Sequence, residues 1–295
     1  MKSFHKLWLV LGTVLGLAHA ADYPTQFPTP QSGIIDTRHN MTQSTLPNGG
    51  GGAMNTVRNN YGEVCVYCHT PHGANTSAAA PLWNRSLPTS TTYQTYNLLN
   101  TFSLTQTVSQ PGAASLTCLS CHDGSQAIDA IINKPGSGQY FATPDPTKWA
   151  PFAAGQTKSV QHHTLIECMV CHTDASGFQF GTDFTAFVIG TDLRNDHPVG
   201  VNFPTTSGTG TDWNTPSGSV TRGSVVTTFF DENTNGRMDK GDIRLYGSGT
   251  DSRVECASCH DPHGVAPGGV GTAMLPTFLR KTNTGSTVCL TCHNK

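Results

Sequence analysis

The sequence predicts a mostly irregular fold of loops and short helices, with few short β-strands, wrapped around covalently attached groups instead of an apolar core. Charged residues make up 12% of the 295-residue chain, against about 25% in an average protein. Glycine, serine, threonine, asparagine and proline are abundant, with 31 Gly and 18 Pro. All ten cysteines belong to one repeated pattern. Such a chain has little apolar material of its own and must fold around something else.

The repeated pattern is Cys-x-x-Cys-His. Its five copies are Cys65/Cys68/His69, Cys118/Cys121/His122, Cys168/Cys171/His172, Cys256/Cys259/His260 and Cys289/Cys292/His293. This is the attachment signature of c-type haem, in which two thiols form thioether bonds and the histidine is the proximal iron ligand. Zinc sites and disulfides also pair cysteines, but five identical units with no cysteine left over favour haem. The sequence predicts five haem c groups, with the chain wrapped around a row of haems.

Six further histidines are candidates for the second, distal iron ligand: His39, His72, His162, His163, His197 and His263. Any one alone would be interpreted as a surface histidine, but six imidazoles for five open positions favour bis-histidine ligation. His72 and His263 each follow a proximal histidine by three residues, in "CHTPHG" and "CHDPHG". That spacing is too short to reach the opposite face of the same haem, so each should bind a neighbouring one. His162 and His163 are adjacent, so either they serve different haems or one is spare.

Residues 1–20 are typical of a secretory signal peptide. Lys2 and Lys6 precede an apolar run over 7–17, and a small-x-small cleavage site ends at Ala20. The apolar run is shorter than the roughly 20 residues of a membrane-spanning helix, although a retained anchor is the alternative. We expect an exported, soluble protein with no membrane span.

Three regions follow the signal peptide. We expect residues 21–60 to form an extended N-terminal arm, and residues 61–295 to form one pentahaem domain with an insertion at about 201–250. The arm, which contains His39, is rich in Pro, Thr and Asn and has no core of its own. Such a segment could reach another subunit; a disordered polar tail is the alternative.

The insertion contains two predicted short strands, 225–230 and 243–246, which are rich in β-branched and aromatic residues. Oxygen-bearing side chains between them follow the spacing of an EF-hand calcium loop, with Gly236 at the bend. The candidate ligands are Asp231, Asn233, Asn235, Arg237 (through its backbone carbonyl), Asp239 and Asp242. The spacing indicates a Ca²⁺ site; a polar hairpin turn is the alternative.

Several stretches resemble exported multihaem c-type cytochromes with doubled CxxCH motifs from metal-reducing bacteria. They are "CVYCHTPHG" (65–73), "APLWNR" (80–85), "SLTCLSCHDG" (115–124), "DHPVG" (196–200), "DIRLYG" (242–247), "VECASCHDPHG" (254–264) and "CLTCHNK" (289–295). Within that class the chain is similar to outer-surface filament (nanowire) cytochromes of the OmcE and OmcS type. The resemblance implies an outer-surface polymer in which a histidine of one subunit ligates a haem of the next. His39 is the candidate for that role.

The predicted function is electron transfer, not enzyme catalysis. The resemblance implies extracellular electron transfer as a nanowire subunit, with redox proteins or extracellular electron acceptors as partners; a discrete periplasmic carrier is an alternative. A multihaem reductase of a small nitrogen or metal substrate is the enzymatic alternative, but a bis-histidine iron leaves no position for substrate. The net charge of -2 without a basic stripe disfavours nucleic-acid binding.

Overall fold

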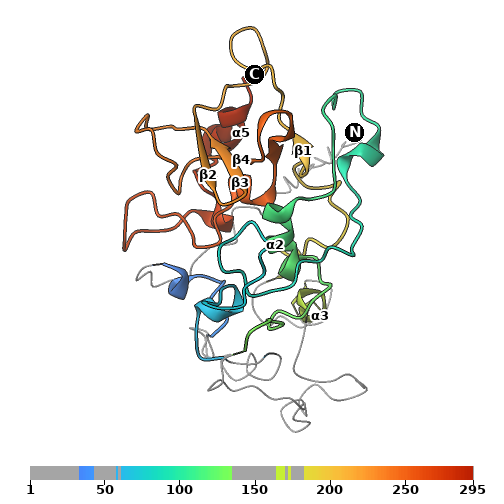
Figure 1. Cartoon of the computed structure of the whole chain (residues 1–295), viewed down its shortest axis with the longest axis vertical. Coiled ribbons are helices and arrows are strands. Elements are labelled where there is room, and N and C mark those ends of the chain that lie inside the picture. The colour runs from blue at the N-terminus through green and yellow to red at the C-terminus, as the bar shows by residue number, and fades with distance from the viewer. Residues whose placement is uncertain are drawn as a thin grey trace, which may run out of the picture.

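A computed structural model describes residues 33–42, 58, 61–134, 164–169, 172–173 and 183–294. In these ranges loops predominate, joined by short helices and one small antiparallel sheet (Figure 1), which confirms the predicted fold class. None of the helices in the described ranges is long and apolar enough to cross a membrane. The predicted signal peptide, most of the N-terminal arm, Cys171, His162 and His163 lie outside the described residues.

The helices are short, and all four α-helices and one 3-10 helix overlap a cysteine motif. The α-helices are α2 (Ala113–His122), α3 (Leu165–Cys168), α4 (Cys256–Cys259) and α5 (Thr287–Cys292), and the 3-10 helices are η2 (Ile34–Asp36), η3 (Cys65–Tyr67), η4 (Tyr96–Leu99), η7 (Gly249–Asp251), η8 (Pro276–Phe278) and η9 (Thr284–Ser286). Residues three apart lie on the same face of a helix. One helical turn therefore directs both thiols of a Cys-x-x-Cys unit the same way.

The strands form one antiparallel sheet in the order β1-β5-β4-β3-β2. They are β1 (Val201–Asn202), β2 (Gly218–Arg222), β3 (Val225–Phe229), β4 (Arg244–Tyr246) and β5 (Arg253–Val254). The two predicted strands correspond to β3 and β4, each one residue shorter, with Phe229 opposite Arg244. Strand β2 was not predicted, because "GSVTR" is mostly small and polar; it joins β3 through Gly223 at φ 60° and Ser224, a two-residue hairpin connection.

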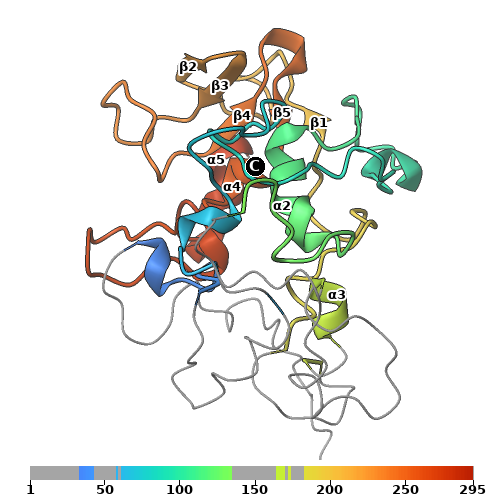
Figure 2. The ribbon, with the colours of Figure 1, turned by 60° about the horizontal axis from the view of Figure 1, so that its bottom comes forward.

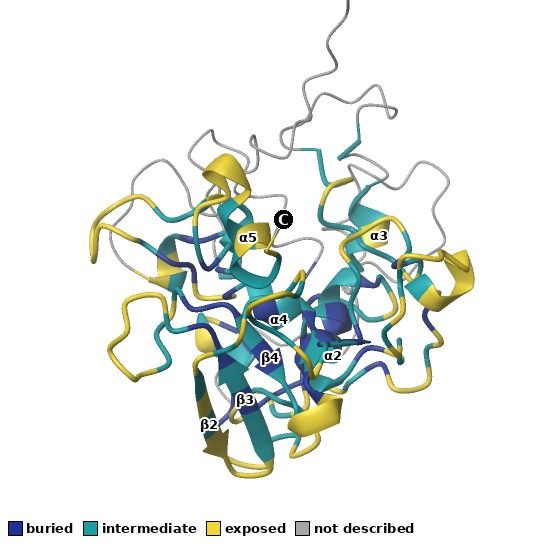
Figure 3. Cartoon of the chain, turned by 90° about the horizontal axis from the view of Figure 1, so that it is seen from above, coloured by how far each residue is buried: buried dark blue, intermediate teal, exposed yellow. Residues whose placement is uncertain are grey.

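The apolar core is divided into three small clusters, each packed against a cysteine motif. The largest consists of Phe203, Phe230, Ile243 and Leu245, and Cys259 and Cys292 pack against it. The second is Tyr61, Tyr67 and Ile131 beside Cys68, and the third is Tyr93, Leu119 and Leu193. Buried residues gather around α2, α4 and β4 (Figure 3). Strand β4 and its neighbouring residues therefore pack against cysteines of the fourth and fifth motifs.

Candidate haem sites

A buried carboxylate joins the second motif to the fourth. Glu255 accepts the backbone N–H of Gly112, 3.1 Å from each carboxylate oxygen, and a short hydrogen bond from the Ser115 hydroxyl. Ser115 Oγ in turn accepts the N–H of Cys256 at 2.9 Å. An acidic group at a helix N-terminus is favourable, because the first N–H groups of the helix lack partners within it. Glu255 therefore caps α2 while it begins α4.

A buried cation holds the first motif region against the end of α2. Arg85 is fully buried, and its guanidinium donates to the carbonyls of Ser120 at 2.8 Å, Ala127 at 2.8 Å and Ile128 at 2.9 Å. Carbonyls near a helix C-terminus carry partial negative charge. Arg85 therefore holds the segment "APLWNR" against the C-terminal end of α2, which carries the second motif.

The thiols of different motifs lie beside one another. Burial raises the pKa of Cys68 to about 12, and the nearby Cys121 thiol of the second motif adds to this rise. The Cys118 thiol shares a hydrogen bond with the Cys256 thiol, which raises the pKa of Cys118 and lowers that of Cys256. Burial also raises the pKa of Cys292 to about 12, with the Cys259 thiol of the fourth motif contributing. Among the described cysteines, the attachment points therefore adjoin in the order first, second, fourth, fifth motif.

The third motif lies at the C-terminal end of α2, where α3 appears below it in Figure 1. The N–H groups of Ile189 and Gly190 donate to the carbonyl of His122 at 2.9 and 3.1 Å. In the same segment, the N–H of Phe184 donates to the carbonyl of His172 at 2.8 Å, and the two rings stack with centroids 4.1 Å apart. The segment from Phe184 to Gly190 therefore connects the second motif to the third.

Three proximal imidazoles have the same kind of hydrogen-bond partner. In each, Nδ1 faces a backbone carbonyl: His69 with Pro81 at 2.7 Å, His122 with Phe187 at 2.6 Å, and His260 with Thr277 at 2.7 Å. A carbonyl only accepts hydrogen bonds, so Nδ1 carries the proton and Nε2 keeps its lone pair. A second partner that fixes the tautomer in this way is usual for a metal-bound histidine. These rings are oriented to bind iron through Nε2.

Two proximal imidazoles lie beside a second imidazole at a ring spacing that suits a shared iron. The ring centroids of His69 and His263 are 6.1 Å apart with planes at 10°, and those of His39 and His122 are 6.1 Å apart with planes at 73°. A metal–imidazole nitrogen distance of about 2.0 Å places two ligand rings on opposite sides of one metal with centroids roughly 6 Å apart. Each pair joins one motif histidine to one of the distal candidates.

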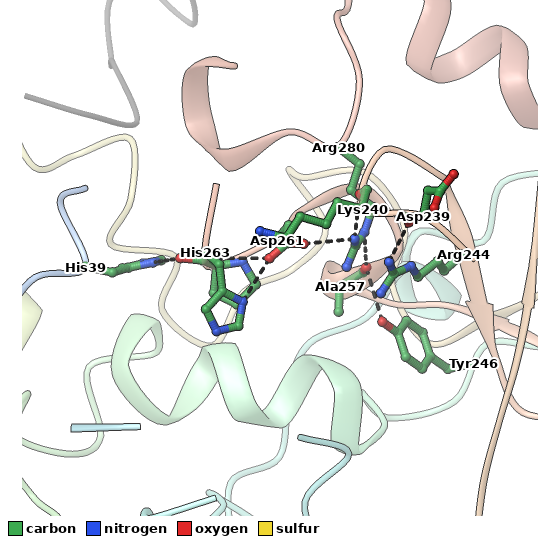
Figure 4. Close-up of polar contacts among 10 residues, drawn as sticks. His39, Asp239, Lys240, Arg244, Tyr246, Ala257, Asp261, His263 and Arg280 are labelled. Carbon is green, nitrogen blue, oxygen red and sulfur yellow. Dashed lines mark hydrogen bonds and ion pairs between the residues drawn. The ribbon is translucent and has the colours of Figure 1, made fainter. Parts of the chain in front are cut away.

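The turn that follows the fourth motif supports both distal rings. His39 Nδ1 donates to the carbonyl of Pro262 at 2.9 Å, and His263 Nδ1 lies 3.1 Å from Asp261 Oδ1. Arg280 contacts the other oxygen of Asp261 at 3.3 Å (Figure 4). Burial opposes ionisation of Asp261, but the bond to His263 and the Arg280 charge outweigh it and lower the pKa of Asp261 to about 2. Figure 2 shows η2 beside this turn and the first motif.

The resemblance made His39 a candidate ligand for another subunit, which stays a prediction; within its own chain the His39 ring lies 6.1 Å from that of His122. Burial, with the adjacent His122, lowers the pKa of His39 to about 4, and burial lowers the pKa of His122 as well. Both rings are therefore neutral near pH 7, the form that binds metals.

The remaining candidates differ in how much the structure says of them. Burial lowers the pKa of His197, and nearby His293 of the fifth motif lowers it further, so these two imidazoles are neighbours. His72 is exposed, and in the described part of the chain only its carbonyl is hydrogen bonded, to Thr70 and Asn133. For His260, no second imidazole at the 6.1 Å ring spacing is found among the described residues, which do not include His162 and His163.

The first site also offers a donor that sequence reasoning missed. Trp83 is buried and its ring lies edge-on to His69, with centroids 6.0 Å apart. Its Nε1–H has no hydrogen-bond partner in the described part of the chain. A buried donor without a partner is costly and indicates a missing acceptor, such as a carboxylate of a bound haem. Its position within "APLWNR" was the only sequence signal. The free donor and the ring pairs both fit haem.

The predicted calcium loop is closed by its own hydrogen bonds. The side-chain amides of Asn233 and Asn235 donate to Asp239 Oδ2 at 2.9 and 2.7 Å, and Asp231 accepts the N–H of Gly236 at 2.6 Å. The N–H of Asp239 donates to Asp242 at 2.7 Å. Across the described ranges, no three His, Cys, Asp or Glu side chains are gathered as a ready-made metal site. The loop therefore brings five of the six predicted ligands together, namely Asp231, Asn233, Asn235, Asp239 and Asp242.

Comparisons with known proteins agree with the cysteine pattern. Residues 250–295 match the family model of the doubled CXXCH motif. No curated protein matches the chain. The match covers the fourth and fifth motifs, and it supports a multihaem c-type cytochrome with covalently bound haem c and a role in electron transfer.

Proposed function

We propose that this protein transfers electrons through five c-type haems whose irons each have two histidine ligands. The observation that supports this best is the pair of ring arrangements, His69 with His263 and His39 with His122, each with centroids 6.1 Å apart. In both, a motif histidine meets a histidine from a distant part of the chain. Two strong ligands on one iron suit electron transfer, because oxidation and reduction then require no ligand exchange.

The chain's own residues hold the sites in place. Haem, when bound, supplies an iron that alternates between the ferric and ferrous states. Backbone carbonyls fix the tautomer of the proximal rings, and Glu255 and Arg85 join neighbouring motifs. Adjacent attachment points at Cys68 and Cys121, and at Cys118 and Cys256, favour electron exchange between successive haems.

We also propose that the protein is exported and works at the outer cell surface as a filament subunit. The resemblance of the cysteine motifs and their flanking stretches supports this proposal. Imaging of purified full-length protein by electron cryo-microscopy tests it. Ordered filaments are expected, whereas monodisperse monomers at high concentration would favour a discrete periplasmic carrier.

A reductase needs an iron with an open position, and this gives the sharpest test against the preferred function. Visible and electron paramagnetic resonance (EPR) spectra of the holoprotein should show low-spin ferric haem that does not change with cyanide or nitrite. A high-spin component, or a spectral shift on adding either anion, would instead support an enzyme.

Calcium binding at residues 231–242 is a separate proposal, supported by the inward arrangement of Asp231, Asn233, Asn235 and Asp239. A chelator should lower the melting temperature of the wild-type holoprotein but not that of Asp231→Ala. An equal response in both proteins would contradict the site.

A further inference from the structure

His263 differs from the other oriented imidazoles in the chemistry of its partner. In the described part of the chain, five candidate ligands place Nδ1 against a backbone carbonyl: His39, His69, His122, His197 and His260. His263 Nδ1 instead faces the carboxylate of Asp261 at 3.1 Å. The carboxylate therefore distinguishes His263 from these five imidazoles.

Contacts to both oxygens fix the position of the Asp261 carboxylate. Asp261 Oδ1 also accepts the backbone N–H of His263 at 3.0 Å, and Oδ2 lies 3.3 Å from the Arg280 guanidinium. Arg280 is fixed by donating to the carbonyls of Ala257 at 3.0 Å and Lys240 at 2.9 Å. Both side chains are buried, with 8% of Asp261 and 3% of Arg280 exposed. Figure 4 shows the continuous row from Arg280 through Asp261 to His263.

A carboxylate changes what the imidazole can donate to a metal. Hydrogen bonds to an ionised acceptor are roughly twice as strong as those to a neutral one. The bond draws the Nδ1 proton toward Asp261, so Nε2 becomes a more basic ligand. A more basic ligand stabilises ferric iron more than ferrous iron, because the ferric ion carries the larger charge. The ferric state is then favoured and the reduction potential falls.

Resting on the bis-histidine ligation proposed above, we propose that Asp261, positioned by Arg280, lowers the reduction potential of the iron bound by His69 and His263. Asp261 is a positioning and tuning residue and does not touch the iron. Reduction adds one electron to the ferric iron, and His263 keeps both its Nδ1 proton and its bond to the metal. The first haem is thereby set apart from haems whose ligands face only carbonyls.

The test is a redox titration of full-length holoprotein, followed by visible spectra, for wild type and Asp261→Asn. Asparagine keeps the shape and removes the charge. Partners of metal ligands change metal-site properties by about tenfold or more, and for a one-electron couple tenfold corresponds to about 59 mV. We expect one of five potentials to rise by about this amount, with the haem count and the low-spin spectrum unchanged.

Asp123→Asn is the matched control. Asp123 is also buried and directly follows a proximal histidine, but its carboxylate accepts hydrogen bonds from Tyr93 at 2.7 Å and Ser125 at 2.7 Å. The Asp123→Asn substitution therefore removes a similar charge but leaves the hydrogen bonds of the candidate ligand rings in place. A smaller shift than in Asp261→Asn supports the proposal. Equal shifts, or unchanged potentials in Asp261→Asn, would overturn it.

Two further measurements keep the result interpretable. If Asp261→Asn does not retain five haems, Asp261→Ser is titrated instead, with the same expected rise, and an unchanged potential there also overturns the proposal. A high-spin first haem in wild type would contradict the ligand pairing itself. Low-spin haem with unchanged potentials in the variant would contradict only the role of Asp261.

Discussion

Residues 69–73 and 260–264 share the pattern His-x-Pro-His-Gly, and both end in a glycine with positive φ, 64° at Gly73 and 76° at Gly264. They differ at the residue after the proximal histidine. Thr70 donates its hydroxyl to the carbonyl of His72 at 3.0 Å, which fixes the backbone only. Asp261 reaches the ring of His263 at 3.1 Å. One residue therefore decides whether the turn merely forms or also orients the imidazole it carries.

The surroundings of the two turns extend this difference. The 260–264 turn is tied to the buried Arg280 and supports His39 through the Pro262 carbonyl. The 69–73 turn is held from outside by Asn133, whose amide donates to the carbonyls of His72 and Gly73, both at 3.0 Å. The 260–264 turn therefore orients His263 and supports His39, whereas the contacts of Thr70 and Asn133 fix only backbone carbonyls of the 69–73 turn.

The largest effect is expected when His263, the second histidine of the 260–264 turn, is replaced. His263→Ala should leave all five haems attached but convert one of them from low-spin to high-spin, because its iron loses a ligand. The same change at His72 should leave the spectrum of the monomeric protein, separated from any filaments, unchanged. Pyridine haemochrome analysis gives the haem count and EPR gives the spin state. Conversion of a haem by both variants, or by neither, would remove the distinction between the turns.

A loss of stability should follow from Arg280→Leu. Removing one partner of a buried ion pair leaves an uncompensated charge and costs about 3–5 kcal/mol. Denaturant unfolding of the holoprotein measures this free energy. Arg194→Ala, which breaks the exposed pair of Arg194 and Asp192, is the control and should have a much smaller effect, because water screens exposed charges. Equal losses in the two variants would show that Arg280 does not anchor the turn.

The smallest loss of stability is expected at the 69–73 turn. Asn133→Ala removes two hydrogen bonds to carbonyls of a partly exposed segment and should cost about 1 kcal/mol. The same denaturant experiment measures it. A loss as large as that of Arg280→Leu would mean that both turns are equally built into the protein.

The local features were accessible from the sequence, because they depend on neighbouring residues. The composition predicts loops and short helices, and the β-branched stretches predict β3 and β4. The sequence also indicated that His263 should serve a neighbouring haem; that remains a prediction, for which the structure supplies the partner ring, His69.

The long-range features were not accessible. The sequence around Asp261 does not predict its contact with Arg280, and the sequence around the second motif does not predict that Glu255 caps α2. Both contacts join segments that are distant in the chain. The pairing of His39 with His122 likewise depends on where residues 33–42 pack. Counting histidines gives the number of ligands but not their partners.

The pairing of axial histidines is tested most directly by an experimental structure of the haem-loaded protein, with irons located by anomalous X-ray scattering. We expect Nε2 of His69 and Nε2 of His263 each at about 2.0 Å from one iron, which belongs to the haem on Cys65 and Cys68. An iron at that haem bound by His69 and any ligand other than His263 would contradict the pairing.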